Sequence, residues 1–364
     1  MKAILVVLVA LTLTCSTSAL AGWEVVYLHP VGTSSSLAWG GTDGRQVGYA
    51  WTGGEEHAAL WSRTAASWID LNPAGSQQSQ AYAVYGNQQV GYADTGDHIA
   101  KAALWSGSAA NWVNLHPTGT GSCCLGICNG QQVGYVVDGN AHAGLWSGTA
   151  ASWVDLNPST AISSMAYGVS NGQQVGYVSD GVNAHASLWS GTAASWADLS
   201  PSESSSSFAY GISNGQQAGY AYVAIEGETY HVAHAGLWSG TAASWVDLQP
   251  AGYLRSRAYG ISDGWQVGYA DKVGYNHRAG LWGGSASSWI DLHSLLPLDC
   301  THSEARGIEV TGSDVWISGH AYNSTAARDE AILWHGIGVV PEPSSLLILG
   351  SGVLAMAGSI RRKR

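Results

Sequence analysis

The sequence predicts an all-β fold, a seven-bladed β-propeller closed by its N-terminal strand. A Leu-Trp pair recurs seven times, and a Gly-Tyr pair precedes most copies at intervals of 42 to 49 residues. A strand-like segment also stands at the start of the body, where it supplies what the last repeat lacks. The repeated tryptophans are Trp61, Trp105, Trp146, Trp189, Trp238, Trp282 and Trp334. The paired tyrosines are Tyr49, Tyr92, Tyr135, Tyr177, Tyr220 and Tyr269, with His320 in the seventh place.

Each repeat divides into four short stretches, as the fourth repeat illustrates. The first runs from Ala166 to Val169, and Asn171-Gly172 follows as a two-residue hairpin signal, because both residues tolerate positive φ. Residues 173–178 form the return strand, residues 185–189 the third strand and residues 196–199 the fourth. Four antiparallel strands in about 43 residues match one propeller blade.

The fourth stretch supports a closed ring. It reads Trp-x-x-Leu with a proline nearby, follows the first six Leu-Trp pairs, and is missing after Trp334. A related segment, Trp23 to Pro30, opens the body. We therefore expect the N-terminal segment to supply the outermost strand of the last blade, which removes the exposed sheet edges. The alternative is an open β-solenoid. A solenoid would not lack a strand in its last repeat and carry the matching strand at its start.

Composition excludes several partners. The chain carries 14 Lys and Arg against 25 Asp and Glu, a formal net charge of −11. Without the two terminal signals, which hold five of the basic residues and Glu342, the body keeps 9 basic and 24 acidic residues and a charge near −15. A body this acidic repels nucleic acid and anionic lipid, so neither is expected as a partner.

Residues 1–21 have the layout of a secretory signal peptide. Lys2 precedes an apolar stretch from Ala3 to Leu13, and a polar segment then ends in Ala19-Leu20-Ala21, an A-x-A cleavage pattern. We expect cleavage after Ala21 and a repeat domain over residues 22–339. Cys15 would suit a lipoprotein, but the residues before it make a poor lipobox.

Residues 340–364 hold three parts in a fixed order. An uncharged apolar run, residues 344–360, is near the lower limit for a helix that crosses a bilayer. The basic residues after it should stay on the cytoplasmic side. We therefore predict a transmembrane helix over 344–360, with a lasting C-terminal anchor as one interpretation. The segment before the run is Val340, Pro341, Glu342 and Pro343, and the basic cluster is Arg361, Arg362, Lys363 and Arg364.

This tail resembles the PEP-CTERM sorting signal of Gram-negative bacteria, because Pro-Glu-Pro stands directly before the apolar run. The resemblance implies that an exosortase-type membrane protease recognises and processes the tail. It also implies export to the cell envelope, with a membrane anchor before processing and the cell surface or extracellular space afterwards. Such tails occur in bacteria that make exopolysaccharide.

The repeat itself resembles the HAF family of extracellular repeats. The matching residues are His234-Ala235-Gly236-Leu237-Trp238, together with the Trp-Val-Asp-Leu, Ala-Tyr-Gly-Ile-Ser and Gly-Gln-Gln-Val-Gly-Tyr stretches. The chain departs from the family by carrying Gly, Ala or Ser in place of Phe before Leu-Trp. The resemblance supports the location and the repeat architecture more than any activity.

Tryptophan is the first candidate for ligand binding. Of the 18 Trp residues, 14 occupy the two repeat positions, Trp23 included, and should pack between blades. Trp39 takes the tyrosine place of Ala-Tyr-Gly, and Trp316 lies near the degenerate Gly-His. Trp51 and Trp265 are therefore the candidate ligand residues, because an exposed aromatic ring can stack on a sugar.

Histidine also recurs, three residues before Leu, at His57, His142, His185 and His234. A residue found once per blade suits a structural hydrogen bond better than catalysis. The candidate partners are Asp70, Asp155, Asp198, Asp247 and Asp291 in the neighbouring strands. Metal ligation by these histidines and calcium binding by the Asx-rich loops are weaker alternatives, and no D-x-D-x-D-G loop is present. We predict no metal and no cofactor.

Four cysteines remain after leader removal: Cys123, Cys124, Cys128 and Cys300. An exported protein can pair them in disulfides. Cys124 and Cys128 lie about 13 Å apart in an extended chain, too far for a direct bond without a bend. A Cys123-Cys124-xxx-Cys128 metal site lacks a second ligand pair.

No His-Glu-x-x-His or phosphate-loop motif is present. We therefore expect a non-catalytic envelope or matrix protein that binds a polysaccharide or a surface protein. The alternative is an extracellular propeller hydrolase or lyase acting on glycan. An enzyme should break the repeat symmetry with polar residues on one rim. The irregular segments are the Cys123 blade, residues 224–232 and residues 293–306.

Overall fold

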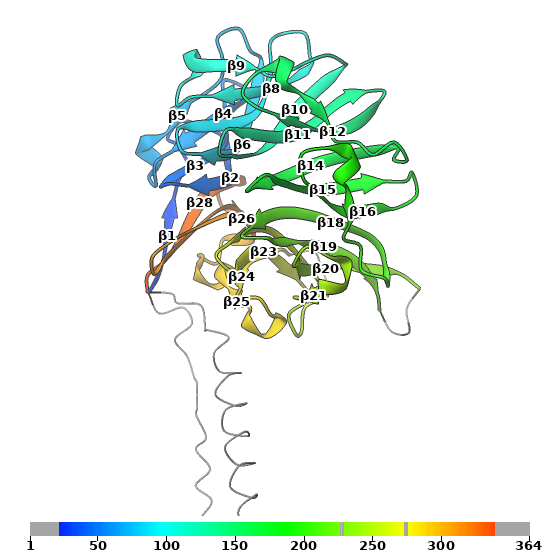
Figure 1. The fold of residues 1–364 in the computed structure, drawn as a ribbon. Coiled ribbons are helices and arrows are strands. Elements are labelled where there is room, and N and C mark those ends of the chain that lie inside the picture. The colour runs from blue at the N-terminus through cyan, green and yellow to red at the C-terminus, as the bar shows by residue number, and fades with distance from the viewer. Residues whose placement is uncertain (1–21, 226, 228, 273–275, 339–364) are drawn as a thin grey trace, which may run out of the picture.

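Seven four-stranded antiparallel sheets surround a central channel, which confirms the predicted seven-bladed propeller (Figure 1). The computed structural model describes residues 22–338 except 226, 228 and 273–275. The expected signal peptide, the sorting tail and the transmembrane helix over 344–360 lie outside these residues. Within the described ranges, no helix is both long enough and apolar enough to cross a membrane.

Each blade is an antiparallel sheet whose strands follow the chain from the channel outward, except in blade seven. Blade one contains β2 (Ser35–Thr42), β3 (Arg45–Thr52), β4 (Glu55–Trp61) and β5 (Ile69–Asp70). Blade two contains β6 (Gln78–Tyr85), β7 (Gln88–Asp94), β8 (Ala100–Trp105) and β9 (Trp112–Asn114). Blade three contains β10 (Gly121–Cys128), β11 (Gln131–Asp138), β12 (Asn140–Trp146) and β13 (Val154–Asp155). Blade four contains β14 (Ser163–Ser170), β15 (Gln173–Ser179), β16 (Ala184–Trp189) and β17 (Ala197–Asp198). Blade five contains β18 (Ser204–Ser213), β19 (Gln216–Ala224), β20 (His231–Trp238) and β21 (Val246–Asp247). Blade six contains β22 (Arg255–Ser262), β23 (Trp265–Asp271), β24 (Arg278–Trp282) and β25 (Ile290–Asp291). Blade seven contains β26 (Cys300–Thr311), β27 (Asp314–Asn323), β28 (Arg328–Gly336) and β1 (Trp23–Tyr27).

Short 3-10 helices complete the connections. Six of them precede the outermost strands of blades one to six, and the seventh leads from blade six into blade seven. They are η1 (Ala65–Ser67), η2 (Ala109–Asn111), η3 (Ala150–Ser152), η4 (Ala193–Ser195), η5 (Ala242–Ser244), η6 (Ala286–Ser288) and η7 (Leu292–Leu295).

The strand directions define two faces. We call the end at which the innermost strands begin the upper face, and the end that carries the first hairpin of each blade the lower face. The hairpin between β14 and β15 confirms its sequence signal, because Asn171 has φ 49° and Gly172 has φ 77°. The chain segments that border the two signals meet at the lower face, where the Ile337 N–H donates to the Gly22 carbonyl at 2.9 Å.

The N-terminal strand closes the ring, as the sequence predicts. β1 pairs antiparallel with β28 as the outermost strand of blade seven. The register differs from the expected one: Val26 pairs with Leu333, just as Val154 pairs with Leu145 in blade three. Val25 therefore takes the place of Trp153. Trp23 lies two residues before Val25 and pairs with Gly336. In sequence, the N-terminal segment matches the fourth stretch of the other blades from Leu28 onward.

The hydrophobic core is divided into clusters that lie between adjacent blades. One cluster joins Leu145 of blade three with Val169 and Trp189 of blade four. The seven tryptophans of the Leu-Trp pairs are fully buried, which confirms that they pack rather than bind ligand. Because each can bury about 150–250 Å², these rings supply much of the interblade contact in a chain with one Phe.

One buried serine on the innermost strand of every blade forms a bridge to the preceding blade. Its oxygen accepts the backbone N–H of an alanine in the third strand of that blade at 2.9–3.1 Å. Its hydroxyl also bonds to a side chain just after the outermost strand of that blade, at 2.5–3.0 Å. We call these residues the interblade serines: Ser36, Ser79, Ser122, Ser164, Ser207, Ser256 and Ser303.

The interblade serines predict a measurable stability cost. Replacing Ser164 by alanine leaves the Ala143 N–H and the Asn157 side chain without this partner in a buried position. Because an unsatisfied buried donor costs about 1–3 kcal/mol, Ser164→Ala should lower the free energy of unfolding by that amount. Urea unfolding of residues 22–338 measures the effect. The exposed Ser159→Ala is the control, and equal stability of the two variants would contradict the bridge.

Candidate functional site

The central channel is lined by one residue from the innermost strand of each blade. Each lies at the β-bulge of its strand, between the two positions at which the register shifts. The bulge turns this residue out of the alternating pattern and toward the channel. Together they enclose a cavity of about 280 Å³. We call them the channel ring: Trp39, Tyr82, Leu125, Tyr167, Tyr210, Tyr259 and Arg306.

The residue after each ring position explains why the channel is narrow. A Cβ atom added to Gly168 would lie 2.8 Å from the Tyr210 carbonyl oxygen, and one added to Gly260 would lie 2.7 Å from that of Arg306. Adjacent innermost strands therefore approach so closely that glycine is favoured at this point. Blade two is the exception, with Ala83 in this place.

Aromatic rings stack around much of the channel. Tyr167 and Tyr210 are stacked with centroids 4.4 Å apart, and Tyr210 meets Tyr259 edge to face at 5.2 Å. Trp39 lies 6.3 Å from Tyr82 on the other side. Burial raises the pKa of the ring tyrosines, so their phenols stay neutral and can donate hydrogen bonds. Stacked, half-buried aromatic rings with polar tips suit a flat ligand that carries hydroxyl groups.

Arg306 breaks the aromatic pattern of the channel ring. Its guanidinium lies over the Tyr259 ring at 4.0 Å and over the Trp39 ring at 4.7 Å, and it forms an ion pair with Glu304. The cation is therefore held by two aromatic faces and one carboxylate. This arrangement fixes Arg306 in place and neutralises most of its charge.

Glu304 stands two residues before Arg306 and accepts a hydrogen bond from His277 Nδ1 at 2.6 Å. Burial raises the pKa of this carboxyl, but the His277 bond and the Arg306 charge outweigh burial and lower the pKa to about 2. His277 also stacks on Tyr269 at 3.9 Å, and its Nε2 lies 3.7 Å from Asp271. Glu304 is thus a carboxylate at neutral pH and a poor proton donor.

His320 occupies the seventh Gly-Tyr place beside this cluster. It meets Trp39 edge to face at 5.9 Å. Burial lowers the pKa of His320 to about 4, although Glu304 acts in the opposite direction. The imidazole is therefore neutral at pH 7.

Arg257 lies one tier above the channel ring, at the interface between blades five and six. Its guanidinium lies over the Tyr220 ring at 4.5 Å and donates a hydrogen bond to the Tyr222 hydroxyl at 3.2 Å. Among the described residues, no carboxylate forms an ion pair with it, and its buried Nε has no hydrogen-bond partner. The side chain is half-buried.

Below the channel ring the cavity continues between aliphatic side chains and glycines. This part measures about 210 Å³ and includes Val84, Ile127, Val169, Ile212 and Ile308. The chemistry that could recognise a polar ligand therefore lies in the ring and on its upper side.

The recurring histidines form the predicted structural pairs. His57, His142, His185 and His234 bond through Nδ1 to Asp70, Asp155, Asp198 and Asp247 at 2.8–3.0 Å. The same aspartates accept a backbone N–H two residues on, at 2.7–2.8 Å, and so hold the connection to the next blade. Asp291 instead pairs with Arg278 at 2.8 Å.

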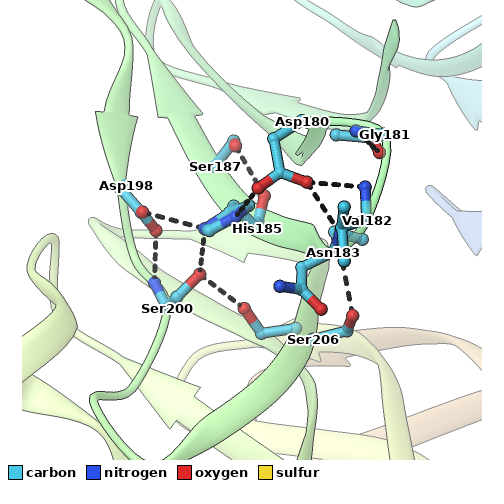
Figure 2. Close-up of polar contacts among 12 residues, drawn as sticks. Asp180, Gly181, Val182, Asn183, His185, Ser187, Asp198, Ser200 and Ser206 are labelled. Atoms are coloured by element: carbon cyan, nitrogen blue, oxygen red, sulfur yellow. Dashed lines mark hydrogen bonds and ion pairs between the residues drawn. The ribbon is translucent and has the colours of Figure 1, made fainter. Parts of the chain in front are cut away.

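Figure 2 shows the pair of blade four, where a serine joins the histidine and the aspartate. Ser200 Oγ lies 3.2 Å from His185 Nδ1, and Asp198 lies 3.0 Å from the same nitrogen. A Ser-His-Asp triad needs the serine and the aspartate on different ring nitrogens. Here Nε2 faces Asp180 at 3.7 Å, so the group is a structural network and not a nucleophile.

The two candidate tryptophans lie far apart. Trp51 is 37% exposed near the upper end of β3 and pairs in register with Ser35 and Glu56. Trp265 is 5% exposed, and its ring packs against Gly283 at the lower face and belongs to the core between blades six and seven. The fold therefore does not bring them into one site, and it leaves Trp51 accessible to a ligand.

The disulfides that the sequence left open are not formed. Cys123, Cys124, Cys128 and Cys300 are free thiols. The first three lie on β10 in blade three and Cys300 lies on β26 in blade seven, so Cys300 has no partner cysteine within reach. Burial raises the pKa of all four thiols, which suppresses thiolate chemistry. Within the described part of the chain, no group of three or more His, Cys, Asp or Glu could hold a metal ion.

Sequence reasoning missed the channel ring. The Ala-Tyr-Gly stretch has the pattern of a strand, and the alternation of a strand does not show that its middle residue points into the channel. The available signal was variation at that one position, where Trp39, Leu125 and Arg306 replace tyrosine while the flanking residues stay small. The irregular segment 293–306 did indicate part of the channel, since it contains Glu304 and Arg306.

Comparison with known proteins identifies the tail. Residues 339–363 match the family described as the PEP-CTERM protein-sorting motif. The chain therefore ends in a PEP-CTERM motif, which indicates export, a cell-envelope or surface location and processing by an exosortase. No curated protein matches the chain.

The fold is similar to propellers of known structure. Puromycin hydrolase has a TM-score of 0.53 and 10% identity, over 84% of this chain and 55% of that one. The β-propeller domain of the Trilobed protease from Pyrococcus furiosus, described as having an open velcro topology, has a TM-score of 0.56 and 8% identity, over 85% of this chain and 99% of that one. The acylaminoacyl peptidase of Pyrococcus horikoshii has a TM-score of 0.50 and 9% identity, over 89% and 55%. The chain spans about half the length of the first and third proteins, and at these identities the likeness is one of fold.

The His-Asp pairs predict a change in stability alone. His185→Ala should lower the free energy of unfolding by about 1 kcal/mol, the scale of a partly exposed ion pair or one hydrogen bond. The melting temperature should fall by about 2–4 °C, and any ligand binding at the channel should persist. Thermal unfolding measures this, with the exposed His231→Ala as control. An unchanged melting temperature would count against the structural role.

His320 predicts a pH effect. Its folded-state pKa of about 4 lies below the ordinary value of 6.5, so the unfolded chain binds the proton more readily. The stability it contributes is complete above pH 6.5 and is lost as the pH falls toward 4, by up to about 3 kcal/mol. In His320→Tyr, which restores the repeat residue, the melting temperature should fall less between pH 7 and pH 4.5. His231→Tyr should behave as wild type, and an unchanged slope in the His320 variant would disprove the assignment.

Proposed function

We propose that this protein is a non-catalytic glycan-binding protein of the cell surface or extracellular matrix. The PEP-CTERM motif supports its export and its sorting by an exosortase. The observation that carries the binding proposal is the channel ring, a stack of half-buried tyrosines around a cavity of about 280 Å³. That volume is near the lower limit of small-molecule sites, so the ring suits one sugar residue or one chain end.

The position of the chain ends supports this assignment. Gly22 and Ile337 meet at the lower face, so a tail that continues from the body starts there. The tier with Arg257 and Glu304 lies on the upper side of the ring. An envelope anchor would therefore leave the upper face directed away from the membrane, where a matrix polysaccharide is accessible. We also propose, from the same position of the upper face, a surface protein as an alternative partner. The extracellular role that the HAF resemblance implies is part of this proposal.

A hydrolase or lyase acting on glycan is the second candidate, because Arg257, Glu304 and Arg306 break the repeat symmetry at one side of the channel. Two properties oppose it. Glycoside hydrolysis commonly needs two carboxyl groups on either side of the bond, and Glu304 is the only carboxylate in the ring and the tier above it. Its pKa of about 2 also makes it a poor general acid.

The test is a glycan array and a panel of glycan hydrolase and lyase assays on residues 22–338. Wild type should bind at least one extracellular glycan and turn over none. Tyr210→Leu should weaken binding by about tenfold, since stacking on one ring is worth about 1 kcal/mol or more. Leucine is the residue of blade three at this place, so the variant should fold.

Tyr85→Leu, an exposed tyrosine at the lower face, is the matched control and should bind as wild type. Turnover of any glycan would overturn the non-catalytic proposal in favour of the second candidate. Absence of binding to every glycan would overturn both.

A further inference from the structure

Arg257 stands at a position where no other blade carries a cation. The equivalent residues are two places before each channel-ring residue: Leu37, Gln80, Cys123, Met165, Phe208 and Glu304. Five of these six are uncharged, so the fold itself does not need an arginine here. The arginine is therefore an addition to the blade pattern, and it lies next to the channel.

The surroundings of Arg257 do not neutralise it. Among the described residues, Arg63, Arg278, Arg306 and Arg328 each form an ion pair with a carboxylate, and Arg257 forms none. Its neighbours are the Tyr220 ring and the Tyr222 hydroxyl, which leave the positive charge in place. The guanidinium thus keeps free donors for a planar anion.

The carboxylates near Arg257 are already engaged. Asp271, on whose pKa the Arg257 charge acts, forms ion pairs with Arg255 at 3.4 Å and with His277 at 3.7 Å. Glu304 is held by Arg306 and by His277. Glu56 belongs to blade one and bonds to Gln80 of blade two, away from the interface of blades five and six. The blade-five and blade-six side of the channel therefore attracts negative charge, within a body whose overall charge is strongly negative.

We propose that Arg257 binds the carboxylate of an acidic sugar, a uronic acid residue, at the upper side of the channel ring. The proposal rests on the glycan-binding function above and names its ligand class. A guanidinium matches a carboxylate with two parallel hydrogen bonds, and the adjoining tyrosines offer flat faces to the sugar. The acidic body repels long polyanions, so a short chain or a chain end is the fitting ligand.

The experiment measures binding of short oligouronides to residues 22–338 by calorimetry. The probes are oligogalacturonides, oligoalginates and hyaluronan oligosaccharides, each paired with its carboxyl-reduced form, in which the acid has become a primary alcohol. Wild type should bind at least one acidic probe at least tenfold more tightly than its reduced form. Affinity should also fall as salt rises.

Arg257→Gln, which carries the blade-two residue, should lose that preference and bind the acidic probe at least tenfold more weakly. Arg257→Lys should recover part of it, because the charge returns without the fork geometry. Arg45→Gln removes the same charge from the lower face and should behave as wild type. A melting temperature for each variant separates lost binding from lost folding.

Three results would overturn the proposal. Equal affinity for acidic and reduced probes, or an Arg257→Gln variant that binds as wild type, would show that Arg257 has only a packing role, and the glycan-binding function would stand. Equally tight binding of dextran sulfate would show general attraction to polyanions instead of carboxylate recognition. Failure to bind any acidic or neutral glycan would remove the proposed function together with this inference.

Discussion

The interblade serine bridge is the interaction on which the rest of the structure depends. A propeller has no continuous hydrogen bonding from one sheet to the next, so side chains must set the spacing between blades. Here one hydroxyl in each blade accepts a backbone N–H from the preceding blade and bonds to a side chain after its outermost strand. The bridge between Ala331 and Ser36 repeats it between blade seven and blade one, where it joins the C-terminal part of the body to the N-terminal part. Because both polar groups are buried, this spacing has little freedom.

The fixed spacing makes the channel. Innermost strands held this closely leave little room for a Cβ after the ring position in every blade except blade two, and the bulge there directs one side chain per blade inward. Seven repeats thereby become a ring of convergent side chains without any one blade being a site. Blades six and seven then depart from the pattern with Arg257, Glu304 and Arg306. The scaffold is symmetric, and the charged residues that break its repeat pattern beside the channel are concentrated on one side.

The closure also relates the two ends of the chain to this chemistry. β1 completes blade seven, so both ends of the body leave from the lower face, next to each other. The residues next to the two signals therefore lie at the end of the propeller opposite to the tier that carries Arg257. This arrangement separates the attachment of the sorting tail from the binding face that we propose.

The sequence by itself determined the blade count, the four strands of each blade and the closing strand, because these depend on local patterns that repeat along the chain. It also determined the His-Asp pairing, since both partners recur at one spacing. It misplaced Trp23 by two residues, because register depends on pairing with β28. It left Trp265 as a ligand candidate, because burial depends on the neighbouring blade. Only the tertiary structure revealed the channel ring and Arg257, because their residues come from different blades and converge only when the ring closes.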